Sequence, residues 1–250
     1  MKELLRKIHR WLGLLMALQI IFWMASGLFF TLYPITEIRG EHLTHPPAAL
    51  QEVEFNDLVP VWAAWNNVKI EMGQAAVADD ISLLFQEGRT WYLVRGHVGD
   101  QAFARRVNGF TGQVAPRIDA ETARYLARQS LAVDGQVENV ELVESAPPGS
   151  EIRGRELPAW RVSFSSPESL NLYLDAWTGQ LLARRTALWR VYDFLWMLHI
   201  MDFQARDNFH TPLLQGAAGL GLLVALTGLT LWFLTTRLLR RRRKGVPSRG

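Results

Sequence analysis

Two long apolar stretches, one near each end of the chain, constrain its fold more than any other feature of the sequence. The first occupies residues 11–34 and the second residues 211–235. An apolar helix of about 20 residues is long enough to cross the roughly 30 Å hydrocarbon core of a bilayer. The sequence therefore predicts two transmembrane helices, with everything between them on one side of a membrane.

Basic residues flank both stretches on the sides nearest the chain termini. They are Lys2, Arg6, Lys7 and Arg10 before the first, and Arg237, Arg240, Arg241, Arg242, Arg243 and Lys244 after the second. Lysine and arginine beside membrane spans stay on the cytoplasmic side. We therefore expect residues 1–10 and 236–250 to be cytoplasmic and residues of about 35–210 to lie outside. The first stretch exceeds the 7–15 residues of a signal-peptide core and lacks an Ala-x-Ala site, which favours a retained anchor.

Charge is divided sharply between the middle of the chain and its ends. Residues 37–185 contain 20 acidic and 14 basic residues, a net charge of −6, whereas the whole chain has a net charge of +3. The positive charge is thus concentrated beside the spans, where lipid headgroups attract it, and no nucleic-acid partner is expected. The chain has no cysteine, so the burial of apolar side chains must stabilise the outer segment, and about 150 residues are enough for a core.

The outer segment contains an internal repeat. Asn108–Gln113 (Asn-Gly-Phe-Thr-Gly-Gln) matches Asp175–Gln180 (Asp-Ala-Trp-Thr-Gly-Gln) at an offset of 67 residues. The same offset relates 55–65 to 122–132, and both segments have helical patterns. Self-similarity at a fixed offset indicates a duplicated structural unit. The fold class predicted is therefore α+β, with two similar units between the transmembrane helices.

Each unit, residues 35–118 and residues 119–185, is expected to hold one helix and a three-stranded antiparallel sheet. Asp119 can cap the second helix, which we expect to continue to about Leu131. Leucines at 170, 172 and 174 alternate with polar residues, a pattern typical of a half-buried strand. The predicted strands are residues 81–86, 90–96 and 102–108 in the first unit and 137–143, 159–165 and 170–176 in the second, with a long loop at 145–158.

Both repeated motifs end in Thr-Gly, which has a backbone explanation. Glycine adopts a positive φ without steric cost, as a turn leaving a sheet requires. Asn108 and Asp175 each stand four residues before the glycine and can accept hydrogen bonds from turn amides. We interpret both motifs as structural turns that supply no catalytic group.

Several motifs together resemble a known family. Leu157–Phe164 followed by Leu172–Gln180 resembles a PepSY domain, and the first unit is a more degenerate copy. Arg6–Gly13 (Arg-Lys-Ile-His-Arg-Trp-Leu-Gly), Leu198-His199 and Thr227–Leu229 resemble the PepSY-associated transmembrane family. This family includes bacterial inner-membrane proteins related to siderophore-iron reductases, in which histidines on the helices hold haem b. The resemblance implies an inner-membrane location and a periplasmic outer domain, although those reductases carry more helices than the two found here.

The resemblance implies haem b ligation by His9 and His199, and His210 is a further candidate ligand. Neutral imidazole is a common axial ligand of haem iron. His9 is expected at the inner face and the other two histidines at the outer face, about 30 Å away by helix rise, so they cannot ligate one iron. An outer haem needs His199 with His210 or a partner's histidine, and an inner haem needs His9 with a histidine of another chain. A homodimer or a larger membrane complex follows. Ordinary interfacial or helix-capping roles are the alternatives for these histidines.

The segment 186–210 is predicted to form an interfacial helix and a loop. The run 187–203 is too short and too charged for a span, and its aromatic residues suit the headgroup level of the outer leaflet. Within the spans, Gln19 is expected to make a helix–helix hydrogen bond. Small residues at 13 and 17, and at 217, 221 and 225, allow close helix packing, either within the chain or in a dimer.

Other kinds of site receive little support from the sequence. His42 and His45 could bind a metal on the outer face, but the two prolines that follow favour an ordinary loop. No nucleophile–base signature, phosphate loop or Rossmann fingerprint occurs, so no flavin or NAD site is expected. Two functions remain open. One is a haem-b electron-transfer component that acts on ferric iron or another periplasmic acceptor, and the other is a non-enzymatic accessory or partner-binding protein anchored by two helices.

Overall fold

The computed structural model describes residues 2–46, 57–86, 88–166 and 168–236. The predicted basic tail and the first two residues of the predicted helix at 55–65 lie outside these ranges. The chain divides into two compact units: Met1–Pro34 with Val191–Gly250, and Ile35–Arg190. We call them the helical unit and the α+β unit and describe each by itself.

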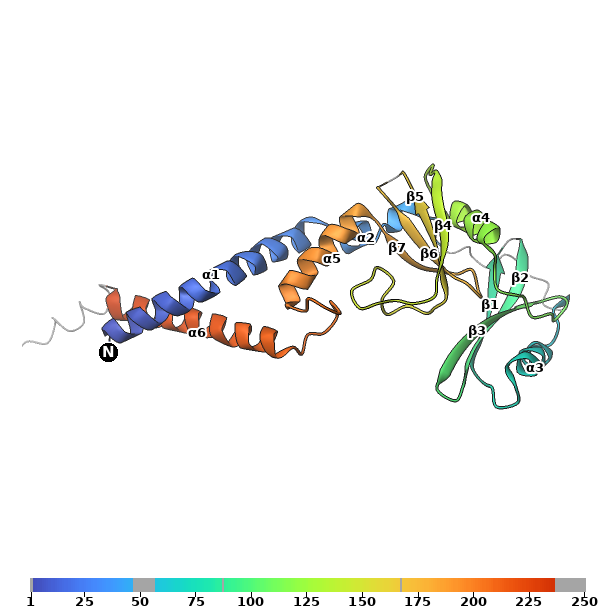
Figure 1. Cartoon of the computed structure of the whole chain (residues 1–250), viewed down its shortest axis with the longest axis horizontal. Coiled ribbons are helices and arrows are strands. Elements are labelled where there is room, and N and C mark those ends of the chain that lie inside the picture. Colours follow the sequence, from blue (N-terminus) through green and yellow to red (C-terminus); the bar gives the residue numbers. More distant parts are fainter. Residues whose placement is uncertain (1, 47–56, 87, 167, 237–250) are drawn as a thin grey trace, which may run out of the picture. The chain divides into compact units, whose positions relative to one another are not determined.

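The helical unit is built on two helices that are long and apolar enough to cross a membrane, α1 (Lys2–Leu32) and α6 (Pro212–Thr235). Gly221 of α6 lies beside Trp23 of α1, and Gly228 lies beside His9, so the two helices run antiparallel (Figure 1). A Cβ at position 221 would lie 3.6 Å from the Trp23 ring. Gly221 and Gly228 therefore allow close packing of α6 on α1 within the chain.

Helix α6 begins as its sequence predicts. The Thr211 hydroxyl accepts a hydrogen bond from the Leu214 amide at 3.2 Å, and Pro212 occupies the first turn. A threonine cap followed by proline is a favourable helix start because it satisfies one free amide and removes another.

Helix α5 (Ala187–Ile200) lies within the segment 186–210 for which the sequence predicts an interfacial helix and a loop. Its second half follows α1 toward the middle of that helix. The Tyr192 ring lies 4.9 Å from Phe30, and farther along the Leu198 carbonyl accepts from Gln19 Nε2 at 3.4 Å. This bond confirms the helix–helix role predicted for Gln19. The aromatic side chains Tyr192 and Trp196 of α5 thus find an apolar partner in Phe30 of α1.

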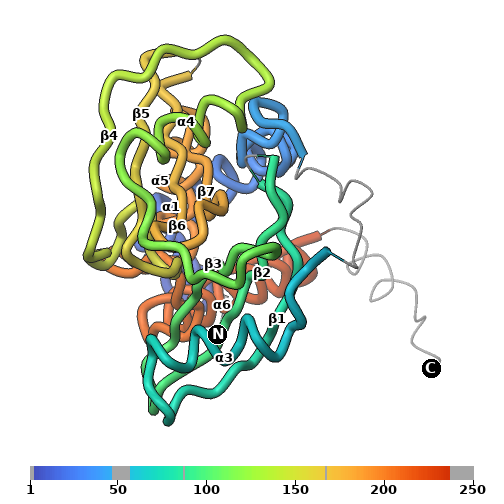
Figure 2. The backbone as a smooth tube through the Cα atoms, turned by 90° about the vertical axis from the view of Figure 1, so that its right-hand side faces the viewer, coloured from blue at the N-terminus to red at the C-terminus, as the bar shows by residue number. Residues whose placement is uncertain are grey.

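The α+β unit contains two antiparallel sheets, each covered by one helix (Figures 1 and 2). Short helices α2 (Ile35–Ile38) and η1 (Glu41–Leu43) lead into it. The first sheet has the order β1–β2–β3, and the second has the order β4–β5–β6–β7. The bounds are α3 Val61–Met72, β1 Val77–Gln86, β2 Arg89–Val98, β3 Gln101–Asn108, α4 Ala120–Ser130, β4 Val137–Val143, β5 Ala159–Phe164, β6 Asn171–Asp175 and β7 Leu181–Arg185.

Each helix packs an apolar face on its own sheet. Ala64 and Val68 of α3 are fully buried against strand residues such as Val94. Leu126 of α4 packs in a second core with Leu172 and other strand residues. Spacings of three and four residues place these side chains on one face of the helix. The Asp119 side chain accepts from the Thr122 amide at 2.8 Å, which confirms the predicted cap.

The two Thr-Gly turns make the same hydrogen bonds. Asn108 Oδ1 accepts from the amides two and three residues later at 2.9 and 3.0 Å, and Asp175 Oδ1 does so at 2.9 and 2.6 Å. Gly112 and Gly179 have φ of 73° and 68°. Each glycine amide also donates to the carbonyl four residues before it. The predicted turn role of these motifs is confirmed.

Two details of the predicted repeat need correction. The second sheet has a fourth strand, β7, because the chain after Gly179 continues without proline and pairs with β6. After Gly112 the chain makes only a bridge from Val114 to β3, and Pro116, which lacks an amide hydrogen, follows. The first helix is also displaced: α3 begins at Val61, so the two helix starts are 59 residues apart rather than 67. Unequal loops between the strands make up the difference.

Candidate functional site

His9 of α1 is held by a hydroxyl of α6. Its Nδ1 lies 3.0 Å from Thr227 Oγ1. The Thr227 hydroxyl has one proton, and it is directed to the Leu223 carbonyl at 2.7 Å. We assign Oγ1 as the acceptor of a hydrogen on Nδ1, an arrangement that leaves a lone pair on Nε2 of the neutral ring.

Glycine makes this contact possible. A Cβ at position 228 would lie 2.9 Å from Cε1 of His9. Real Cβ atoms do not approach that closely, so any larger residue would displace the imidazole. Thr227 and Gly228 thus act together, since one orients the ring and the other makes room for it.

His199 of α5 is held in the same way by a hydroxyl of α1. Its Nδ1 lies 2.7 Å from Ser26 Oγ. The Ser26 hydroxyl donates to the Phe22 carbonyl at 2.6 Å, and we assign its Oγ as the acceptor of a hydrogen on His199 Nδ1. This imidazole also carries its hydrogen on Nδ1 and presents a lone pair on Nε2. Within the described part of the chain, Nε2 of neither His9 nor His199 has a hydrogen-bond partner.

Aromatic rings enclose His199. The Trp196 ring stacks with the imidazole at 6.5 Å and an interplanar angle of 7°, and Phe30 meets it edge-on at 5.5 Å. Trp23 Nε1 donates to the His199 carbonyl at 2.8 Å, which fixes the end of α5 to α1. Burial lowers the pKa of His199. The neutral ring, which is the form that binds metals, is therefore favoured.

The two histidines belong to separate sites. His9 and Ser26 are 17 positions apart on α1, about 25 Å at 1.5 Å per residue. One iron cannot accept both. The exposed His210 stands just before α6, and its amide donates to Asn208 Oδ1 at 2.8 Å. Among the described residues, no hydrogen bond or ring contact joins His210 to His199.

The loop between α5 and α6 is ordered by two buried carboxylates. Asp202 accepts four backbone amides of residues 204, 205, 207 and 208 at 3.0–3.3 Å, and these bonds lower its pKa. Asp193 pairs with Arg206 at 2.5 Å. Trp196 Nε1 also donates to the Arg206 carbonyl at 3.2 Å. The loop therefore supports the ring that stacks on His199.

Sequence reasoning did not identify Ser26 as a functional residue, and it used Thr227 and Gly228 only as part of a family resemblance. The sequence carried no local signal that would have identified them. Hydroxyl and glycine positions are unremarkable in an apolar helix, but each of these lies at the depth of a histidine on a neighbouring helix. That correspondence depends on the register between helices, which the sequence alone does not specify.

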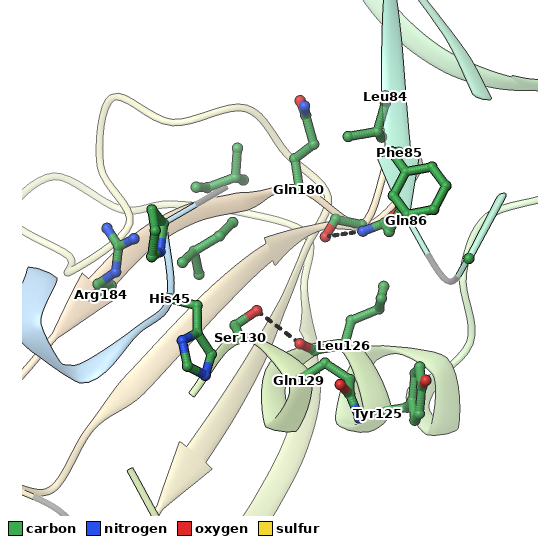
Figure 3. Close-up of a pocket in the computed structure, with 15 residues that line it drawn as sticks. His45, Leu84, Phe85, Gln86, Tyr125, Leu126, Gln129, Ser130, Gln180 and Arg184 are labelled. Atoms are coloured by element: carbon green, nitrogen blue, oxygen red, sulfur yellow. Dashed lines mark hydrogen bonds between the residues drawn. The ribbon is translucent and has the colours of Figure 1, made fainter. Parts of the chain in front are cut away.

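The α+β unit contains a cavity of about 610 Å³ between its two sheets. Figure 3 shows edge-strand residues of β1 and β7, together with α4, around it. Gln86 Nε2 donates to the Gly179 carbonyl at 3.1 Å and joins the first sheet to the second Thr-Gly turn. His45 lines this cavity, whereas His42 faces Glu168 at 3.7 Å. Among the described residues, no group of three or more His, Cys, Asp or Glu side chains is arranged to hold a metal ion.

The donor chemistry of the helical unit suits haem. A neutral imidazole with its Nδ1 hydrogen engaged and its Nε2 lone pair directed elsewhere is the arrangement found for metal-bound histidine. His9 and His199 each supply one such nitrogen.

Comparisons with known proteins bear on the family. A solved structure from Clostridium difficile 630, described as a lipoprotein, matches 54% of this chain and 99% of its own, at 15% identity and a TM-score of 0.24. A score that low supports no argument. No curated protein matches the chain significantly. The family described as "PepSY-associated TM region" matches residues 6–249, which is nearly the whole chain. The chain is therefore a membrane protein with two apolar helices and an α+β domain, and it belongs to the PepSY-associated TM region family.

Proposed function

We propose that this protein is a haem-b electron-transfer component of the bacterial inner membrane. It would pass electrons outward to ferric iron or another periplasmic acceptor. One observation carries the proposal: His9 and His199 each contact a helical hydroxyl through Nδ1, and with that hydroxyl assigned as the acceptor each Nε2 lone pair is left as a ligand. The two histidines lie at two different levels of the helical unit, as a path for electrons across a membrane requires.

The residues assigned to each haem follow from these contacts. His9, oriented by Thr227, would hold haem at the inner level, and His199, oriented by Ser26, would hold haem at the outer level. Bound haem would supply a one-electron iron couple. The protein side chains would fix the imidazole tautomer and orientation. Trp196 and Phe30 would exclude water from the outer site.

The missing second ligands support a homodimer. A second copy of His9 would complete the inner site, and His210 or a partner's histidine would complete the outer one. Gly13 of α1 has no atom within 4 Å of the position a Cβ would occupy, and Ala17 on the same face is exposed. Small residues on an open helix face permit close approach of another helix. Two copies would bring four spans together.

The test is an absorption spectrum of the full-length protein purified after expression with ample haem. The proposal expects a Soret band and a reduced-minus-oxidised α band. Folded but colourless protein would reject haem binding by this chain alone.

The proposed orientation has both termini in the cytoplasm and the α+β unit, here taken as two PepSY-like units, in the periplasm. The basic residues beside both spans support it. The chain has no native cysteine, so single cysteines can be placed at Gly88 and Pro148 without background. Both should react with a membrane-impermeant maleimide in intact spheroplasts. Protection of both sites until the membrane is opened would reverse the orientation.

The cavity of the α+β unit favours a second function, that of an accessory protein which binds a periplasmic partner or ligand. Its walls combine apolar side chains with the polar ends of Gln129 and Gln180 (Figure 3). The absorption spectrum described above distinguishes the two functions, because only the electron-transfer function requires bound haem. A colourless protein that copurifies with another periplasmic or membrane protein, and loses it when Leu181→Glu blocks the cavity, would support the accessory function.

A further inference from the structure

Two sheet edges line the cavity of the α+β unit, and the proposed haem function makes no use of them. The strand orders β1–β2–β3 and β4–β5–β6–β7 leave β1 and β7 each with a neighbouring strand on one side only. Alternate residues of an edge strand direct their amide and carbonyl groups away from the sheet. The lining residues from these two edges are Leu84, Phe85 and Gln86 of β1 and Leu181, Leu182 and Arg184 of β7.

The size and the walls of this cavity suit a short extended peptide. Its volume of about 610 Å³ lies within the usual range of ligand sites. Strand β7 has five residues, about 17 Å of extended chain. The half-buried side chains of Leu84, Phe85, Leu181 and Leu182 offer apolar contacts along the two edges. A peptide that adds to a sheet edge uses both features, since its backbone pairs with the edge strand while alternate side chains enter apolar pockets.

The charge of the cavity favours a ligand with a carboxylate. Among the described residues that line it, Arg184 carries the only permanent charge and none is acidic, although residues 37–185 have a net charge of −6. Figure 3 shows Arg184 and His45 on one side of the cavity and Gln86 on the other. A positive site in an acidic domain is complementary to an anionic ligand.

Arg184 has donors to offer to such a ligand. Its Nε donates to Thr44 Oγ1 at 2.5 Å, and among the described residues no hydrogen bond or ion pair engages its two terminal nitrogens. The nearby Glu41 lies 4.0 Å from Arg39, with which it forms an ion pair. Burial lowers the pKa of Arg184, and the charge of Glu41 offsets only part of that effect. A bound carboxylate would stabilise this half-buried cation.

We propose that the cavity binds an extended peptide segment of another protein, which adds as a strand at the free edge of β7 and places a carboxylate against Arg184. Guanidinium and carboxylate groups form paired, charge-assisted hydrogen bonds. Leu84 and Phe85 on the opposite edge would contact apolar side chains of the peptide. This site gives the accessory function a specific ligand class, and it does not depend on haem in the helical unit.

The test is retention of peptide mixtures by the purified full-length protein in detergent, measured by gel filtration and mass spectrometry. The probes are pentapeptides in which threonine alternates with valine, leucine or phenylalanine and which contain one glutamate at any position. A second set replaces the glutamate with glutamine, and a third set is methylated at its backbone nitrogens. Wild type should retain the glutamate set about tenfold better than the glutamine set, the effect of one charge-assisted hydrogen bond. It should not retain the methylated set, which cannot donate hydrogen bonds to a sheet edge.

Variants separate the charge from the shape of the cavity. Arg184→Gln should abolish the preference for glutamate, and Arg184→Lys should keep part of it. If Arg184→Gln does not fold, Gln129→Glu provides the second test, because it adds a carboxylate to the cavity lining at an exposed position of α4 and should also abolish the preference. Arg117→Gln is the matched control, since it removes an exposed arginine that pairs with Glu144 and does not line the cavity.

Three results would overturn the proposal. They are failure of wild type to retain any set, equal retention of the glutamate and glutamine sets, and undiminished retention of the methylated set. A preference that survives both Arg184→Gln and Gln129→Glu would also overturn it. The absorption spectrum of the same preparations reports haem separately, so failure of peptide binding and failure of the haem function are distinguishable.

Discussion

The two units of this protein use their polar residues in different ways. In the α+β unit, the repeated polar residues bond to backbone: Asn108 and Asp175 satisfy turn amides, and Gly112 and Gly179 supply the positive φ. In the helical unit, polar residues that occur singly in the sequence meet as pairs across helices, such as His9 with Thr227.

This difference separates residues that build the fold from residues that could carry its chemistry. A motif that is repeated along the sequence marks positions that have the same structural role in both copies of the repeated unit. A polar side chain that occurs once in an apolar helix must find a partner in space, because leaving it unpaired in an apolar environment is costly. Substitutions in the α+β turns should therefore change stability, and substitutions at the helical pairs should change haem content.

The largest effect is expected from His199→Ala and His9→Ala. Each substitution removes the lone pair assigned to one level of the helical unit, so each should abolish the part of the bis-histidine signal that comes from that level while the protein stays folded. Reduced-minus-oxidised spectra and haem quantification measure this. His97→Ala, which removes an exposed histidine that bonds to Asp79 in the α+β unit, is the control and should leave the spectrum unchanged. If all three variants keep a full signal, the assigned ligands are wrong.

The next effect concerns glycine in the turns. Gly179→Val should lower the free energy of unfolding by about 2–4 kcal/mol, because it adds crowding to the cost of a positive φ. A Cβ there would lie 2.7 Å from Leu126 and 3.0 Å from Gln86. Gly112→Val should cost less, about 1–2 kcal/mol, since its nearest contact would be Asn67 at 3.2 Å.

Gly99→Val separates these two contributions. Gly99 also has a positive φ, of 59°, but a Cβ there would meet no atom within 4 Å. Thermal unfolding followed by near-ultraviolet circular dichroism should rank the variants Gly179, Gly112, Gly99 from most to least destabilised. Equal losses in all three would show that strain alone matters and that the second turn has no special packing role.

A pH effect should appear at Glu151. Burial raises the pKa of this carboxyl, but hydrogen bonds from Arg190, Asn171 and Tyr173 outweigh burial, so the net pKa lies below its ordinary value of 4.5. The stabilisation from the ionised form is therefore present above pH 4.5 and is lost as the pH falls through the lowered value. Glu151→Gln should cost about 1–2 kcal/mol at pH 7, the range for a charged hydrogen bond.

Acid titration of stability provides the measurement. The difference between wild type and Glu151→Gln should shrink as the pH falls from 5 toward 3. Glu138→Gln on β4, which removes an exposed carboxyl, is the control. A difference that stays constant across this range would contradict the ionised role of Glu151.

The sequence predicted those parts of the fold that depend on local pattern. The ends of α6, the cap at Asp119 and the span of β4 agree with the structure because caps and alternation are encoded within a few residues. The turn bonds agree for the same reason. The assumption of a single offset of 67 residues between the two units misplaced the first helix, because loops of unequal length give each pair of corresponding elements its own offset.

The parts that sequence reasoning missed depend on tertiary contacts. Strand β7 is weakly patterned and forms because the turn at Gly179 returns it to β6. Asp193 of α5 pairs with Arg206 from the following loop, a contact that no local pattern specifies. The hydroxyl partners of His9 and His199 lie on other helices, 218 and 173 positions away in the chain. No local pattern encodes separations of that size.

The smallest effect is expected at the hydroxyls, and it tests whether the two histidine sites use the same chemistry. Ser26→Ala and Thr227→Val each remove one acceptor for an imidazole Nδ1–H while preserving most of the side-chain volume. A hydrogen bond at Nδ1 makes the ring a stronger electron donor, which stabilises ferric iron. Its loss should raise the midpoint potential of the corresponding haem by about 20–60 mV, which is 0.5–1.5 kcal/mol for one electron.

Thr230→Val is the matched control, because its hydroxyl makes the same helical bond to Leu226 at 2.8 Å and touches no histidine. Spectroelectrochemical titration of the purified protein should show one shifted potential in each variant and none in the control. Two unshifted potentials in protein that retains its haem would mean that the hydroxyls only pack the helices, and the parallel between the inner and outer sites would then end at the histidines themselves.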